Sequence, residues 1–177
     1  IQEDLSRWYI RLVRRRTWVE EEDPSKTAVY FVLYKTFMCL TRLLAPFMPH
    51  LAERIHLDLG GKGSVHEQDW PKPDPRFTDP ELEESMEIVR KIVEAGASAR
   101  QAAGLKLRWP VKEIIVELSL DTLEKVKPLS DVLSQALNCK KLTLLTQAVS
   151  LPKKVSIYKS QWGRVIVDTE LTEELLN

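Results

Sequence analysis

The sequence predicts a mainly α protein, with an antiparallel four-helix bundle over residues 1–108 and a small α/β module over residues 109–177. Before Gly104, apolar residues recur at the spacing of one helix face in four segments long enough to be helices. Beyond Gly104 the period changes to the alternation of a half-buried strand. The composition, 44% hydrophobic and 29% charged with zero net charge, is that of an ordinary folded domain.

The first predicted helix covers about residues 2–21 and has two distinct faces. Its apolar arc collects Ile1, Leu5, Trp8, Leu12 and Val19. The opposite side carries a basic arc of Arg7, Arg11, Arg14 and Trp18. Such an arc is either a solvated helix face or a surface that follows RNA phosphates, with the tryptophan placed to stack on a base. The spacing alone leaves both readings open.

The second predicted helix covers about residues 24–45 and begins at a cap formed by Asp23 and Pro24. It is apolar nearly all round, so we expect it at the buried centre of the bundle. Tyr30, Tyr34 and Met38 are accordingly interpreted as core residues rather than a binding surface.

Prolines at positions 46 and 49 end the second helix, and a third helix is predicted from Pro49 to about Leu59. Gly60 and Gly61 supply a left-handed C-terminal cap. His50 and His56 lack partners at metal-ligand spacing, and we expect them at caps or on the surface. Residues 60–80 form a long connection that we expect to be packed by Trp70 and Phe77.

The fourth predicted helix starts at the cap formed by Asp79 and Pro80 and ends at Gly104. Its predicted buried stripe is Leu82, Met86, Val89, Val93 and Gly96, with Arg100 continuing the same stripe. Two readings of Arg100 remain open. Its guanidinium points into a groove where the core ends, or it complements the C-terminus of its own helix.

A basic and aromatic tract follows this helix. Residues 90–112 contain six Lys or Arg residues against one acidic residue, in a chain that is neutral overall. Lys106, Arg108 and Trp109 lie in this tract, just before Pro110. We interpret the local imbalance as the best lead to function, because a generic polyanion binder would be basic throughout.

The second half predicts an α/β module. Ile114, Val116 and Leu118 alternate with polar residues as in a strand. A helical stretch over residues 121–137 breaks near Pro128, and three further short strands are predicted at residues 141–145, 155–158 and 164–167. Residues 161–163 form the turn between the last two strands.

The sequence lacks the motifs of common active sites. It has no glycine-rich phosphate loop, no HExxH or CxxC motif, and no nucleophile paired with a base. We therefore predict no catalytic residue, no metal site and a binding role. No apolar run approaches the roughly 20 residues of a membrane span. Both ends begin or stop within helical patterns, so we expect the chain to be a fragment of a larger protein.

Four segments, in this order, resemble the class I aminoacyl-tRNA synthetases that serve isoleucine, valine and leucine. They read DLSRWYIRLVRRRTW, LLAPFMPHLAERI, SVHEQDWP and ARQAAGLKLRWPV. The second and third do not choose among the three amino acids. The first and last are similar to the isoleucyl enzymes in their archaeal and eukaryotic form. The alternatives are a valyl or leucyl enzyme, or a non-enzymatic protein-interaction domain.

The resemblance implies an anticodon-binding bundle whose partners are an isoleucine-accepting tRNA and the rest of the synthetase, in the cytoplasm. ATP and Mg would belong to the catalytic domain, because the HIGH and KMSKS motifs are absent from this chain, which needs no cofactor of its own. The implied RNA-binding residues are Arg7, Arg11, Arg14, Trp18, Arg100, Lys106, Arg108 and Trp109. We expect mostly phosphate contacts from the first four and base contacts from the last four, with Trp109 alternatively a packing residue at the hinge.

Overall fold

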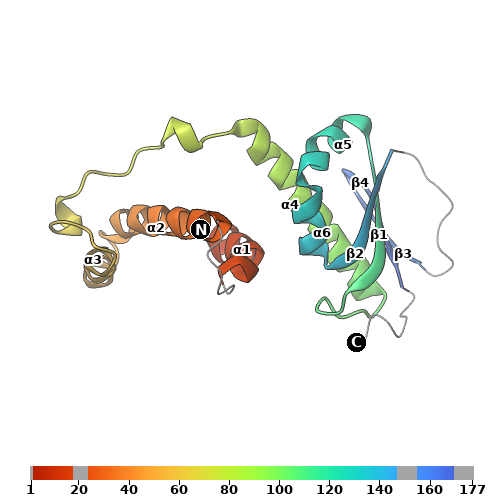
Figure 1. Cartoon of the computed structure of the whole chain (residues 1–177), viewed down its shortest axis with the longest axis horizontal. Coiled ribbons are helices and arrows are strands. Elements are labelled where there is room, and N and C mark those ends of the chain that lie inside the picture. Colours follow the sequence, from red (N-terminus) through yellow and green to blue (C-terminus); the bar gives the residue numbers. More distant parts are fainter. Residues whose placement is uncertain (1, 18–23, 147–154, 170–177) are drawn as a thin grey trace. The chain divides into compact units, whose positions relative to one another are not determined.

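The structure is a computed structural model that describes residues 2–17, 24–146 and 155–169 (Figure 1). It is mostly helical, with one small mixed β-sheet. The chain divides into two compact units, residues 1–78 and residues 79–177. The first unit contains helices and short turns, and the second contains one long helix, the sheet and its crossover helices.

The first unit confirms three of the predicted helices. Its elements are a π-helical segment Gln2–Tyr9, α1 Ile10–Thr17, α2 Pro24–Leu44, α3 Pro49–Asp58 and 3₁₀ turns at Val65–Glu67 and Pro75–Phe77. One cluster of its buried residues gathers Ala45, Ala52 and Val65, with Leu44 packed against them. The Glu53 carboxylate accepts from the backbone N–H of Val65 at 2.7 Å, which lowers the pKa of Glu53.

The end of α3 confirms the predicted glycine cap. Gly60 has a φ of 79°, its N–H donates to the carbonyl of Leu57, and the Gly61 N–H donates to that of His56 at 2.8 Å. This pattern is a Schellman motif. His50 is exposed, as expected, but His56 is 1% exposed, so the surface or cap role predicted for His56 is wrong. Gly61 lies so close to the His56 ring that a side chain at 61 would overlap it.

Helix α2 is not the buried centre of this unit. It buries Val29 and Thr41, whereas Tyr30 and Tyr34 are exposed and Met38 is half-buried. Within this unit the core prediction therefore fails for the two tyrosines, whose side chains are exposed. By length and composition α2 is also apolar enough to cross a membrane, contrary to the sequence expectation, although a bundle's core helix meets the same test.

The long connection is anchored differently from the prediction. Trp70 and Phe77 are 61% and 66% exposed, so they do not pack it against a core. Its buried residue is Val65, held by the Glu53 hydrogen bond. The presence of aromatic residues in a loop is therefore not enough to predict which of its residues is buried.

The second unit confirms the predicted α/β module. Its elements are α4 Pro80–Ala102, β1 Val111–Leu118, α5 Leu120–Val126, a 3₁₀ turn Lys127–Leu129, α6 Ser130–Leu137, β2 Cys139–Leu145, β3 Val155–Ser160 and β4 Gly163–Asp168. The sheet order is β2-β1-β4-β3. β1 and β2 are parallel through the α5–α6 crossover, and the other pairs are antiparallel.

The sheet packs against α4 and α6, and α5 packs against α4 (Figure 1). Ile114 and Val116 of β1 are fully buried, and they pair with Val167 and Val165 of β4. Glu117 alternates with them and accepts two hydrogen bonds from the Arg164 guanidinium at 2.8 Å. The predicted alternation of β1 is thus confirmed.

Helix α4 buries only part of the predicted stripe. Of the predicted stripe, Val89, Gly96 and Arg100 are buried, whereas Leu82 is 48% exposed and Met86 and Val93 are half-buried. Outside the predicted stripe, Ile88, Ile92, Ala95 and Ala99 are also buried. Because α4 has a broad apolar arc, periodicity located the arc without telling which part meets the sheet.

By its contacts, α4 belongs with the sheet rather than with α1–α3, since the second compact unit begins at Asp79. Its N-cap is confirmed, because the Asp79 side chain accepts from the Leu82 N–H at 3.0 Å. The domain division after residue 108 stays a prediction, because one helix can pack on a sheet with one face and in a bundle with another.

Gly163 offers a test of the β1–β4 pairing. Its φ is 149°, and a Cβ there would overlap the carbonyl oxygen of Glu117. We expect Gly163→Ala to lower the free energy of unfolding by about 1–3 kcal/mol, measured by urea denaturation. Gly104→Ala is a useful comparison, because it is strained by its φ of 71° but meets no atom within 4 Å. Equal losses in the two variants would contradict the steric account.

Candidate nucleic-acid interface

The turn that leaves α4, residues 104–110, is the exit turn. Gly104 has a φ of 71°, and its N–H donates to the Gln101 carbonyl at 3.0 Å. The Leu105 N–H donates to the carbonyl of Arg100 at 2.9 Å, which completes a second Schellman motif. The predicted end of the helix at Gly104 is confirmed.

Arg100 holds the exit turn from within. Its side chain is 1% exposed, and its Nη1 donates to the carbonyl of Leu137 at 2.8 Å. Its Nη2 donates to the carbonyl of Lys106 at 2.9 Å and also to that of Trp109. Burial lowers the pKa of Arg100, but a guanidinium remains protonated at neutral pH. The groove-pointing interpretation is therefore wrong, because the guanidinium is enclosed by carbonyl oxygens.

Asn138 holds the same turn from the other side. It follows α6 in the left-handed region, with a φ of 51°, and its Nδ2 donates to the carbonyls of Leu107 and Arg108 at 3.2 Å each. Its own carbonyl accepts from the Val111 N–H at 3.1 Å. Arg100 and Asn138 thus bind four consecutive carbonyls, those of residues 106–109. We call this arrangement the carbonyl clamp.

The clamp turns the side chains of the exit turn outward. Lys106 and Arg108 are exposed, and Trp109 is half-buried. The Lys106 ammonium lies 5.3 Å from the centroid of the Trp109 ring, within range of a cation–π contact. Two guanidinium or ammonium groups and a partly accessible indole therefore share one rigid turn.

The basic arc of the first helix is also exposed. Arg7, Arg11 and Arg14 all face solvent, the first on the π-helical segment and the others on α1. Arg7 pairs with Glu3 at 2.7 Å, an exposed pair that an incoming phosphate can replace. Trp18 lies outside the described residues. The two predicted basic groups belong to different units, the arc to the first and the exit turn to the second.

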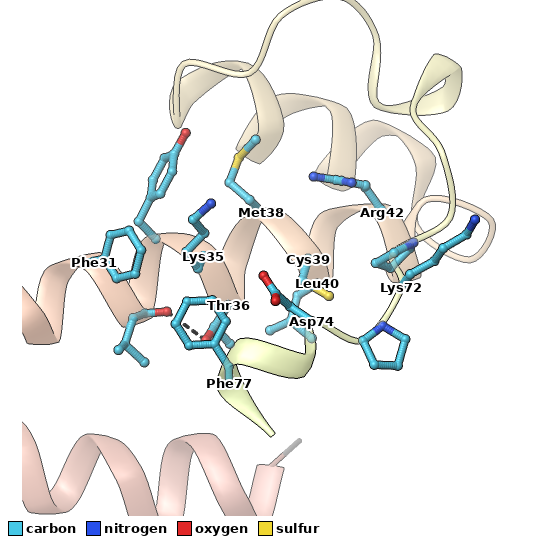
Figure 2. A pocket seen from close by; sticks show the side chains of 14 residues that line it. Phe31, Lys35, Thr36, Met38, Cys39, Leu40, Arg42, Lys72, Asp74 and Phe77 are labelled. Atoms are coloured by element: carbon cyan, nitrogen blue, oxygen red, sulfur yellow. Dashed lines mark hydrogen bonds between the residues drawn. The ribbon is translucent and has the colours of Figure 1, made fainter. Parts of the chain in front are cut away.

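Sequence reasoning missed a groove in the first unit (Figure 2). It has a volume of about 830 Å³ and lies between α2 and residues 71–77. Phe31 and Phe77 line it with ring centroids 6.4 Å apart, and Lys35 lies 5.7 Å from the Phe31 ring. At its edge, hydrogen bonds from Arg76 lower the pKa of Asp74 to about 2. The signal in the sequence that could have indicated this groove was the number of aromatic residues in α2.

Within residues 2–17, 24–146 and 155–169, no three His, Cys, Asp or Glu side chains gather as a metal site. Cys39 and Cys139 are free thiols, and burial raises the pKa of Cys139. What the described site offers is hydrogen bonding, charge and stacking.

Comparison with known families defines the class of protein. Residues 1–116 match the family described as the anticodon-binding domain of tRNA ligase, and the chain belongs to that family. This match includes α4, the exit turn and most of β1.

Among its relatives are isoleucine–tRNA ligases of archaea. The chain is 46% identical to the enzyme of Methanopyrus kandleri over 94% of the chain's own length. It is 50% identical to the enzyme of Pyrococcus furiosus over 81% of the chain's length. It is 44% identical to that of Methanosarcina acetivorans over 93%. The matched region is 16%, 14% and 17% of these relatives, so the chain spans about a sixth of their length.

The carbonyl clamp predicts that Arg100 is needed for stability. We expect Arg100→Met to lower the free energy of unfolding by about 3 kcal/mol, because three carbonyls would lose a charged donor. Amide hydrogen exchange at Trp109 and Val111 should accelerate as the exit turn loosens. Lys91→Met, which removes an exposed cation from the same helix, should change stability by less than about 0.5 kcal/mol. Similar stability in both variants would contradict the clamp.

Proposed function

We propose that the chain binds the anticodon stem and loop of an isoleucine-accepting tRNA, as part of an isoleucine–tRNA ligase. The observation that carries the proposal is the exit turn, whose basic and aromatic side chains are directed outward by the carbonyl clamp. The family match and the names of the relatives support it independently. The specificity for isoleucine is supported by those names and by the two isoleucyl-like segments.

The chemistry of the exit turn suits a single-stranded RNA loop. Loop bases are unstacked, so they can stack on an aromatic ring or a guanidinium plane, while nearby cations neutralise phosphates. Trp109 and Arg108 provide the two stacking groups, and Lys106 provides a point charge beside them. The exposed Arg7, Arg11 and Arg14 are assigned to phosphates of the stem, with Trp18 beside them as the sequence predicts.

Arg100 has a different part in this proposal. It was expected to contact RNA, but its guanidinium is buried against carbonyls. We therefore assign it to positioning: it fixes the backbone from which Lys106, Arg108 and Trp109 project. Asn138 has the same role from the sheet side.

The activity of the whole protein is assigned outside this chain. We propose that a catalytic domain elsewhere in the ligase binds ATP and Mg and attaches isoleucine to the tRNA, and that the enzyme works in the cytoplasm. The remainder of the synthetase is then the second partner of this domain, beside the tRNA. No catalytic residue, metal or cofactor is assigned to the chain itself.

Titration with four RNAs tests the proposed specificity. The chain should bind isoleucine tRNA more tightly than the same tRNA with a swapped anticodon, and more tightly than valine or leucine tRNA. Affinity should fall with salt, because phosphate contacts release counterions. Equal binding to all of these RNAs would contradict anticodon reading. Binding to an acidic protein but to none of the RNAs would favour the protein-interaction alternative.

Single substitutions in the exit turn should make the affinity for RNA depend less on salt concentration. We expect Lys106→Ala and Arg108→Ala each to weaken RNA binding and to lower the slope of log affinity against log salt by about 1 per lost phosphate contact. Lys159→Ala is the matched control, because Lys159 is an exposed cation on β3. An equal effect of all three variants would show that binding is diffuse rather than centred on the exit turn.

We also propose that the helices up to residue 102 close into the antiparallel four-helix bundle that the sequence predicts. Within its own unit, α2 leaves Tyr30, Tyr34 and Phe37 exposed. On α4, Leu82 is 48% exposed and Met86 and Val93 are half-buried. Apolar faces of this extent are usually covered in a folded protein, which supports a bundle core rather than a membrane span for α2.

If the bundle forms, Leu82 should be more buried than it is within residues 79–177 taken by themselves. If the bundle forms, Leu82→Ser should lower the free energy of unfolding by about 2 kcal/mol, because a packed side chain is removed. Leu120→Ser, at a leucine that is 67% exposed at the start of α5, should cost less than about 0.5 kcal/mol. Urea denaturation of the whole chain measures both. A negligible loss for Leu82→Ser would contradict the bundle.

A further inference from the structure

A hollow lies beside the exit turn, on the side of α4 away from its buried core. It has a volume of about 410 Å³ and is lined by Ala97, Ser98, Gln101, Gly104, Leu105, Lys106 and Leu107. The last two turns of α4 form one wall, and the exit turn forms the other. All the lining residues belong to the second unit.

The lining combines small apolar surface with three polar groups. A Cβ on Gly104 would meet no atom within 4 Å, so this glycine leaves the hollow open. The Ser98 hydroxyl donates to the Glu94 carbonyl at 3.0 Å, which leaves its oxygen able to accept a hydrogen bond. Gln101 is exposed, and no described residue hydrogen-bonds its side-chain amide. Lys106 supplies the one charge in the lining.

The walls of the hollow are fixed before any ligand arrives. The Schellman motif sets Gly104 and Leu105, and Arg100 holds the Lys106 carbonyl at 2.9 Å. Asn138 holds the Leu107 carbonyl at 3.2 Å. A ligand therefore does not have to order this backbone when it binds, which favours affinity and selectivity at a small site.

We propose that this hollow takes one base of the anticodon loop and that Gln101 determines which base is accepted. The inference rests on the proposed function and names the part of the RNA that the site reads. A glutamine amide presents one donor and one acceptor side by side, which matches the N6 and N7 edge of adenine.

The lining favours a nucleobase over other ligands. It contains no carboxylate, so it does not suit a cation, and its one ammonium lies beside Trp109. A neutral planar ring with a polar edge fits the apolar wall of Ala97 and Leu105 and the amide of Gln101. Lys106 and Arg108 then lie where the flanking phosphates would pass.

The experiment uses the whole chain and a set of anticodon stem-loop RNAs. In each RNA, one adenine of the loop is replaced by purine riboside, which lacks the exocyclic amino group. The wild-type chain should lose about 5- to 150-fold in affinity at one position, the range of a bidentate base contact. Gln101→Ala should bind the unmodified RNA correspondingly more weakly and show no further loss at that position. Gln101→Glu should bind the unmodified RNA more weakly, because a carboxylate cannot donate to adenine N7, but it should still discriminate the modified base, because a carboxylate accepts from the exocyclic amino group.

Gln161→Ala is the matched control, an exposed glutamine in the β3–β4 turn, which adjoins the opposite end of β1 from the exit turn. It should keep both the affinity and the discrimination of the wild type. If Gln101→Ala still discriminates the modified base, the inference is wrong while RNA binding stands. If the wild type shows no loss at any loop adenine, base reading by this hollow is also overturned. If the wild type binds no stem-loop, the proposed function itself fails.

Discussion

The buried guanidinium of Arg100 is the interaction on which the second unit depends. A buried cation costs stability unless it is compensated, and carbonyl oxygens accept from Nη1 and Nη2 here, while Nε is buried without a hydrogen-bond partner among the described residues. Those carbonyls come from the end of α6 and from the exit turn, so one side chain joins three parts of the chain. Asn138 completes the set, since it binds the two carbonyls that Arg100 does not reach. The exit turn is rigid because four of its backbone carbonyls accept hydrogen bonds from these two side chains.

This arrangement explains why a small sheet follows the last long helix. The exit turn by itself has one backbone hydrogen bond, from the Trp109 N–H to the Lys106 carbonyl at 3.1 Å. Its remaining support comes from Arg100 of α4 and from Asn138, which follows α6 and leads into β2. The crossover places Leu137 and Asn138 against the turn, because β2 lies parallel to β1 and begins beside Val111. The α/β module therefore braces the turn, whether or not it contacts RNA itself.

Local chemistry in the sequence predicted the ends of elements but not the contacts between them. The Asp79 cap and the glycine caps at Gly60 and Gly104 depend on residues a few positions away, and all three were confirmed. The partners of Arg100 include a carbonyl 37 positions away, which no helical spacing could identify. Likewise the period of α4 showed a broad apolar arc, but the burial of Ile88 and Ile92 and the exposure of Leu82 depend on tertiary packing. Asn138 carried a readable signal, an asparagine directly between a helix and a strand, whose role became clear from its carbonyl partners.

A neutral chain constrains how this domain can recognise RNA. With zero net charge, long-range attraction contributes little, and binding depends on a few local cations. Few contacts give useful affinity when the groups that make them are already ordered, because ordering costs free energy at the moment of binding. The backbone of residues 106–109 is already ordered in the folded chain, because Arg100 and Asn138 donate hydrogen bonds to its four carbonyls. The basic turn can therefore be short, and the rest of the surface can remain balanced in charge.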